Sequence, residues 1–585
     1  MKRLRAAHVA ARSERGAALV MALLVLVVLT AFGLTLIGLG LTEVATSTNW
    51  RDYTKDFYAA EAALENGVVG LRNLLASTPN PTQDQLNLIT AGLTTPTLRD
   101  PGLTFGTYSI TSLAPSYPST FASGPYAGLL GTVFAYQIRA QVNGQSGTRA
   151  DLTQVFQYTQ VPLFQFGVFY GKGVDLEIAP GPAMTFNGRV HANSSIYVGA
   201  GNTLSFDSYI TTAGSIYRRL KRDSAIPWGA NPRIKDASGT YRTLNFDSQY
   251  QPGFSSTWAN PRAWAAQADS LFRGTVKDSA MGVGDITPPI PELFQNPTNP
   301  DTVARQLIER PQAGDSPALA AAKMYSQAGL RIIDGVATEQ NGNTVTLPAG
   351  GLTTKTFFDT RENKTMTVTE LDINILRTNG AFPTNGVVYV AGTNLASNPA
   401  VRLVNGAQLP QPPNKGLTVV SENPVYVQGD YNTVGKRPAA IMADAITVLS
   451  NNWGPNNSDI KGNQSQINPA TNPPRNYTKG DRPATPTTVN AAFALGPSAE
   501  SRMGTGNGQL ENVIRFLEDW GGKTFTYSGS IIALWHSLQA TGQWACCTYH
   551  GPPTRNWSYD TLFNTSPPPG TPQGVIMSKG RWSQS

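Results

Sequence analysis

Cysteine is almost absent from this chain of 585 residues, and the two that occur, Cys546 and Cys547, are adjacent. Two cysteines cannot cross-link a chain of this length, so packing must hold the core. Adjacent cysteines can form only a strained vicinal disulfide, and we expect either two thiols or one such ring in a turn. With His550 they match zinc poorly, because zinc takes four ligands at wider spacing. No metal or other cofactor is predicted.

Charged residues are also scarce, at 14% of the chain, and four histidines leave little capacity for general-base chemistry. The formal net charge is +7, but residues 1–16 hold five basic side chains against one acid, which leaves +3 for the remainder. So small a global charge does not by itself bind nucleic acid. Glycine and proline number 56 and 42. This polar, turn-rich composition favours an extracellular β protein over a helical cytosolic enzyme.

The chain does contain one long apolar run. Residues 17–42 carry no charge, and a helix of that length covers roughly 39 Å, more than the ~30 Å hydrocarbon layer of a membrane. The basic residues precede it, which predicts a single-pass inner-membrane precursor with a cytoplasmic N-terminus. Arg15 and Gly16 stand directly before the run, and no small-residue cleavage site of the secretory kind follows it. Cleavage between Gly16 and Ala17 would leave the apolar helix attached to the mature protein. The alternative interpretation is that residues 17–42 are a simple single-span membrane anchor.

The helical pattern continues past the apolar run and predicts one helix over residues 17–75. Its apolar positions recur at three- and four-residue intervals, at Phe57, Ala60, Leu64, Val68, Leu71 and Leu75. The runs RGAALVMALLVLVVLTAFGL and AAEAALENG resemble the N-terminal region of PilX-type minor pilins of type IV pili, over about residues 12–75. The resemblance implies removal of the leader 1–16 by a prepilin peptidase. It also implies assembly with other minor and major pilins through the helix, with later display outside the cell in the pilus.

Met21 departs from the pattern of major pilins, which carry Glu at this fifth position of the mature chain. In that family the carboxylate neutralises the N-terminal amine of a neighbouring subunit, and a buried unpaired charge is costly. A chain with Met21 lacks this carboxylate. The resemblance therefore favours a place at the filament tip, as for the tip pseudopilin of type II secretion systems.

The rest of the chain predicts an α+β, mainly β fold. Alternating strands indicate a small antiparallel pilin-like sheet within residues 76–165. Short apolar runs between Gly and Asn turns suit a large β-solenoid in two parts, 166–219 and 381–585, with a β-sandwich as the alternative. Residues 220–380 are interpreted as a helical or irregular insertion. Residues 510–520 are interpreted as a helix that flanks the solenoid.

Segments such as PGPAMTFNGRVHANSSIYVGAG and FDSYITTAGSIYRR also resemble the large ectodomains fused to PilX-type N-termini. Among these, ComZ-like minor pilins of natural competence carry a β-solenoid and are associated with DNA uptake. The resemblance implies a non-catalytic minor pilin that serves pilus assembly, adhesion and DNA uptake. The alternatives are a type II secretion tip pseudopilin and an adhesin for surfaces or glycans.

A polysaccharide-acting enzyme is a distant alternative. Such enzymes need paired carboxylates on one face, and Asp175 and Glu177 form the only such pair near a predicted rung. No second acidic rung follows at the matching offset. His191 is interpreted as a hydrogen-bonded turn residue.

The best local candidate for phosphate contact is the segment YRRLKRD. It contains Tyr217, Arg218, Arg219, Lys221 and Arg222. Four cations in five positions could contact several phosphates, and the tyrosine could stack on a base. Arg233 and Lys235 could extend the patch. The alternative is a solvated basic turn, or arginines paired with nearby acids.

Two further features could bind ligands. Aromatic residues near the C-terminus are expected to be exposed and to stack on sugars, bases or one another: Trp535, Trp544, Tyr549, Trp557 and Tyr559. The loop with Asn456, Asn457 and Asp459 would supply few negative ligands for calcium, so we interpret it as a solvated turn.

Overall fold

The computed structural model describes residues 7–78, 81–92, 102–121, 126, 129–144, 147–221, 229–246, 261–412, 415–453, 482–498, 509–543 and 549–584. The chain divides into two compact units. The first comprises Met1–Pro118, Thr132–Thr159 and Ile576–Ser585, and the second comprises Ser119–Gly131 and Gln160–Val575. Each unit is described by itself.

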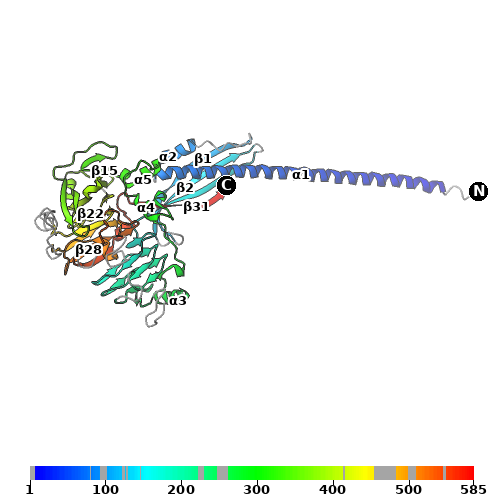
Figure 1. Ribbon diagram of the computed structural model, residues 1–585. Coiled ribbons are helices and arrows are strands. Elements are labelled where there is room, and N and C mark those ends of the chain that lie inside the picture. Colours follow the sequence, from blue (N-terminus) through cyan, green and yellow to red (C-terminus); the bar gives the residue numbers. More distant parts are fainter. Residues whose placement is uncertain are drawn as a thin grey trace, which may run out of the picture. The chain divides into compact units, whose positions relative to one another are not determined.

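The first unit combines a long helix with a four-stranded sheet. Helix α1 (Ala7–Ser77) is continuous over 71 residues, and α2 (Gln83–Gly92) follows it (Figure 1). The sheet has the order β1-β2-β3-β31, with β1 Thr104–Thr120, β2 Leu130–Asn143, β3 Arg149–Pro162 and β31 Gln573–Gln584. The predicted long helix is confirmed. The sheet, however, is completed by the last residues of the chain, which the sequence assigns to the solenoid.

The second half of α1 packs against this sheet through one apolar face. The buried residues on the helix include Ala60, Leu64, Val68, Leu71 and Leu75, as the periodicity predicts, while Phe57 is only partly buried. Gly67 allows the helix to lie close to the sheet, because a Cβ there would meet Ile138 at 3.0 Å. The Tyr108 hydroxyl donates to the Ala63 carbonyl oxygen at 2.9 Å and fixes the helix on the sheet.

The second unit begins with strands of two or three residues stacked in parallel layers. β4 (Val168–Tyr170), β5 (Leu176–Ile178) and β6 (Met184–Phe186) are followed by β7 (Val190–Ala192), β8 (Ile196–Val198) and β9 (Leu204–Phe206). The second three pair with the first three, strand for strand. β10 (Ile210–Thr212), β11 (Ile216–Tyr217) and β12 (Arg233–Lys235) add a third layer. Strands this short are not stable alone, and here each one pairs with the corresponding strand of the next layer.

The longest sheet of this unit contains eleven strands in the order β14-β10-β7-β4-β29-β26-β23-β21-β19-β15-β16. The chain enters it in the middle at β4 and extends it to β14 (Val276–Lys277). It resumes at the opposite end with β15 (Leu330–Ile333) and β16 (Val336–Glu339). It then returns through β19 (Val387–Ala391), β21 (Leu417–Val420), β23 (Ala439–Met442), β26 (Ala492–Ala494) and β29 (Ile531–Ala533), which pairs with β4 in parallel. Two halves distant in sequence thus share one core.

The other sheets are mainly parallel. One has the order β17-β18-β20-β22-β24-β27, with β17 Leu352–Asp359, β18 Lys364–Asp372, β20 Pro399–Val404, β22 Val425–Gln428, β24 Ile446–Leu449 and β27 Ile514–Arg515. In this sheet β17 is antiparallel to β18. Another contains β25 (Thr487–Asn490), β28 (Thr524–Gly529) and β30 (Thr554–Tyr559). The hairpin strand β13 (Tyr241–Thr243) lies antiparallel to β12. The predicted predominance of β structure is confirmed.

Two sequence assignments differ from the structure. The interval 220–380 does contain the helices α3 (Pro261–Phe272), α4 (Pro300–Arg305), α5 (Pro317–Ala322), α6 (Met324–Gln327) and α7 (Ile373–Thr378), but it also supplies β12 to β18. The predicted helix 510–520 is wrong: a 3-10 turn, Leu510–Asn512, precedes β27. Neighbours on all sides bury this segment, and β24 supplies its strand partner.

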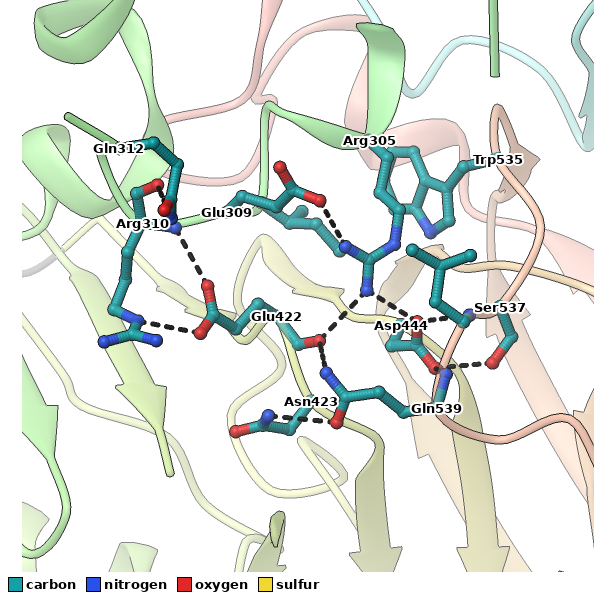
Figure 2. Close-up of polar contacts among 12 residues, drawn as sticks. Arg305, Glu309, Arg310, Gln312, Glu422, Asn423, Asp444, Trp535, Ser537 and Gln539 are labelled. Atoms are coloured by element: carbon teal, nitrogen blue, oxygen red, sulfur yellow. Dashed lines mark hydrogen bonds and ion pairs between the residues drawn. The ribbon is translucent and has the colours of Figure 1, made fainter. Parts of the chain in front are cut away.

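Within the second unit, charged side chains hold helix α4 against the segments that carry Glu422 and Asp444 (Figure 2). Arg305 donates to Asp444 at 2.7 Å and also pairs with Glu309. Arg310 donates to Glu422 at 2.7 Å. Asp444 also accepts from the backbone amides of 538–540 and from the Ser537 hydroxyl. One buried carboxylate therefore joins α4 to the turn that follows β29.

Candidate functional site: the apolar N-terminal helix

The N-terminal half of α1 presents apolar side chains on every face. Met21 is 66% exposed and Phe32 is 65% exposed, and the apolar residues between Leu19 and Val44 are similarly open. Soluble proteins rarely expose apolar patches larger than a few hundred Å². Among the described residues, this is the one helix long and apolar enough to cross a membrane. Its surface requires lipid or other helices around it.

The polar groups within this segment are satisfied by the helix itself. The hydroxyls of Thr30, Thr35 and Thr42 each donate to the carbonyl oxygen four residues earlier, at 2.6–2.8 Å. In an apolar medium an unsatisfied hydroxyl is costly, because no water is present to replace the missing partner. These internal bonds suit the segment to lipid or to a dry helix bundle.

The residues of the predicted processing site lie within this helix. Gly16 and Ala17 are exposed residues of α1. No atom lies within 4 Å of a Cβ placed on Gly16. Met21 lies one turn further along, with its side chain equally open. The structure therefore places these three residues together on an accessible stretch of helix.

The basic segment after β11 is not an open cluster of cations. Arg218 is only 3% exposed and donates to the Gly229 carbonyl oxygen at 2.9 Å. Lys221 forms an ion pair of 2.9 Å with Asp175. Arg219 lies over the Tyr217 ring, 4.5 Å from its centroid. Arg222 lies outside the described residues. Two of the residues predicted to contact phosphate, Arg218 and Lys221, thus bind a backbone carbonyl oxygen and a carboxylate of the protein instead.

An aromatic pair accompanies this segment. Tyr197 of β8 stacks on Tyr217 of β11 with ring centroids 4.8 Å apart, because the two strands are in parallel register. Sequence reasoning missed Tyr197. The repeated tripeptide Ser-Ile-Tyr, twenty residues apart at 195–197 and 215–217, is the signal that could have found it.

Arg233 and Lys235 form a separate group on β12. Both lie against the Tyr241 ring, each 5.1 Å from its centroid. Lys235 is also 3.2 Å from Asp207. These two cations therefore have partners of their own around Tyr241.

The other candidate residues have structural partners. Asp175 accepts from the Ser195 amide at 2.9 Å, and Glu177 is buried. His191 is buried between Thr211 and Asn193, at 2.8 and 2.9 Å, and burial lowers its pKa to about 4. It is hydrogen-bonded, as expected, and belongs to strand β7.

The expected exposure of the C-terminal aromatics is wrong for three of them. Trp535, Tyr549 and Trp557 are buried, and Tyr559 is partly exposed. Their rings pack into the core instead of offering a stacking surface. Outside the described residues lie Trp544, Cys546, Cys547 and the loop residues Asn456, Asn457 and Asp459.

Comparison with known proteins bears on the N-terminal helix alone. Residues 15–65 match the family model described as PilX N-terminal. The matched part is a pilin domain. It indicates a minor pilin related to type IV pili, and such a domain associates with other pilus components. No curated protein and no solved structure matches the chain. The matched residues coincide with the exposed apolar helix and its first turns on the sheet.

Proposed function

We propose that this protein is a non-catalytic minor pilin that waits in the inner membrane and is then assembled into a type IV pilus. The observation that carries the proposal is the exposed apolar half of α1, which matches PilX N-termini and continues without a break into a folded head. In the precursor, the apolar segment lies in lipid with the N-terminus in the cytoplasm. In the pilus, it lies among the helices of neighbouring subunits.

Met21 supports a place at or near the filament tip. A subunit with Met at this position has no carboxylate to neutralise the N-terminal amine of a neighbour, and an uncompensated charge between packed helices is costly. At the tip no further subunit lies above this chain, so no N-terminal amine above it needs a carboxylate from position 21. Labelling of a tagged chain in purified pili tests this position, because label spread evenly along the filaments would contradict it.

For the second unit we infer a β-solenoid that is displayed by the pilin head. Its support is the parallel stacking of successive strands, such as Val168, Val190 and Ile210 side by side. A body of this kind suits adhesion or capture of a ligand. A type II secretion tip pseudopilin remains the second candidate, because a missing glutamate and a large extra domain fit it equally.

DNA uptake is the specific version that the Tyr197–Tyr217–Arg219 stack favours. Aromatic rings and an arginine plane suit single-stranded or splayed nucleic acid. Because the Arg219 guanidinium lies over the Tyr217 ring, Arg219 is the residue to test. Substitution Arg219→Gln should weaken salt-dependent DNA binding by the full chain, and equal binding by both proteins would reject this version.

Processing tests the proposed function directly. The full chain should be shortened to begin at Ala17 when a prepilin peptidase is co-expressed, and mass spectrometry of the product reads this out. The variant Gly16→Val should stay uncleaved while it folds normally, because no neighbouring atom lies within reach of the new side chain. A wild-type chain that keeps its first sixteen residues beside an active peptidase would contradict the proposal.

A further inference from the structure

The second unit contains a cavity of about 180 Å³. A single water needs only ~10–15 Å³ in this measure, so there is room for a small molecule. One wall is formed by Gly171, Asn193 and Leu534, which directly follow β4, β7 and β29. Because these three strands are neighbours in the long sheet, their ends meet at one edge. The opposite wall is the segment 285–304.

Specific bonds hold the segment 285–304 in place over the sheet edge. The Asn193 amide accepts from the Ile286 amide at 2.8 Å and donates to the Ile286 carbonyl at 2.7 Å. Asp301 accepts from the His536 amide at 2.8 Å. Arg305 extends the attachment to Asp444 at 2.7 Å (Figure 2). The segment that forms this wall is therefore anchored at both of its ends.

The interior of the cavity is mainly apolar. Ile290, Phe294, Ala304 and Leu534 line it. The side-chain amides that also line it form bonds within the protein. Asn193 binds Ile286, and the Gln295 side chain donates to the Ile290 carbonyl oxygen at 2.6 Å. The Asn296 side-chain oxygen accepts from the backbone amides of 298 and 299. A buried polar ligand group would find few partners there, and desolvation would oppose its entry. The interior suits an apolar side chain.

The mouth of the cavity carries one pair of opposite charges. The Lys172 ammonium lies 2.9 Å from the Asp285 carboxylate, and these side chains are 52% and 45% exposed. A ligand with only a carboxylate would take Lys172 and leave Asp285 without its partner. A ligand with only an ammonium group would do the reverse. A zwitterion replaces both halves of the pair at once.

We propose that this cavity binds a free α-amino acid with an apolar side chain. The side chain fills the cavity, the carboxylate of the ligand meets Lys172, and its ammonium group meets Asp285. Small-molecule sites typically combine apolar walls with a few placed polar groups in this way. The site lies entirely within the second unit and goes beyond the pilin function, on which it does not depend.

Binding of L-leucine to the full chain in detergent tests the proposal. Saturation-transfer NMR should detect saturable binding of leucine at millimolar concentration. N-acetyl-leucine, which lacks the ammonium group, and leucinamide, which lacks the carboxylate, should each bind about tenfold more weakly or worse. Absence of leucine binding, or equal binding of the three probes, would overturn the proposal.

Two substitutions locate the binding. Ala304→Leu should abolish it by filling the cavity, whereas Ala318→Leu on the exposed part of α5 should leave it unchanged. Lys172→Gln should weaken leucine binding about tenfold, and Lys355→Gln on exposed β17 should have no effect. Because Lys172 is half exposed, its variant is expected to fold even if Ala304→Leu does not. Unchanged leucine binding in Lys172→Gln would refute the assignment.

Discussion

At the scale of single residues, burial sets the acid–base behaviour of Glu511. Its side chain is 4% exposed, and desolvation raises its pKa from the ordinary 4.5 to about 7. The folded chain thus holds this proton more tightly than the unfolded chain. The contribution of this bound proton to the free energy of unfolding is fully present below about pH 4.5, and it is lost as the pH rises through 7.

Substitution Glu511→Gln should therefore flatten the pH dependence of unfolding. Between pH 5 and 8 the wild-type second unit should lose on the order of 1–3 kcal/mol through this group, and the variant should lose that much less. Glu518, whose pKa burial likewise raises to about 7, keeps part of the slope in the variant. Denaturant unfolding of the full chain at each pH measures this change in the free energy of unfolding, with Glu339→Gln on exposed β16 as the control. Identical slopes in Glu511→Gln and wild type would contradict the assignment.

Residue type and spacing predicted the helix face but not the state of the basic segment. The periodicity identified Leu64, Val68 and Leu71 because the spacing of a helix fixes which side chains share a face. Arg218 and Lys221 looked alike in sequence. One is buried on a carbonyl oxygen and the other pairs with Asp175, which is 46 positions away in the chain. Such partners are set by the parallel pairing of strands distant in the chain, which no local pattern encodes.

At the scale of elements, the failure of the helix prediction at 510–520 shows how burial erases periodicity. A helical pattern is informative when one face meets water. Here Leu510, Val513 and Ile514 are buried, and so is Phe516. Glu511, Arg515 and Glu518 are buried as well. No face of the segment meets water, so the apolar spacing does not distinguish a helix from a 3-10 turn followed by a short strand. The available partner, β24, decides for the strand.

Another element-scale feature is the dependence of α4 and the turn 537–540 on Asp444. The variant Asp444→Ala removes the carboxylate that both elements share, and it leaves Arg305 without its 2.7 Å partner (Figure 2). Breaking a buried pair in this way costs about 3–5 kcal/mol. Hydrogen exchange of the full chain should therefore rise in both 300–310 and 537–540. Asp269→Ala on the exposed face of α3 is the control. Faster exchange in only one of the two segments would show that Asp444 does not join them.

At the scale of the whole molecule, the main segment of the second unit, Gln160–Val575, is inserted in the chain between two neighbouring strands of one sheet. β3 ends at Pro162 and its neighbour β31 begins at Gln573. The sequence predicts strands within residues 76–165, where β1, β2 and β3 lie, but assigns the residues of β31 to the solenoid. β3 and β31 pair although about four hundred residues separate them in the chain, and the segment 573–584 contains no motif that identifies β3 as its partner. Such a pairing depends on which edge strand of the sheet lacks a partner, and this can be seen only in the three-dimensional structure.

This topology predicts that the first unit depends on the last residues of the chain. In the structure Trp582 packs on Phe57 of α1 with centroids 5.9 Å apart, and Met577 packs on the helix–sheet core. Removal of residues 576–585 deletes these contacts and the strand pairing to β3, and should destabilise the first unit by about 2–4 kcal/mol. Hydrogen exchange should rise along β3 but stay unchanged in β28 of the second unit. Lys579→Gln is the matched control, because it removes only the exposed ion pair with Glu65, worth about 0–1 kcal/mol. If β3 exchanges equally slowly in the truncated and complete chains, the sheet of the first unit does not need its fourth strand.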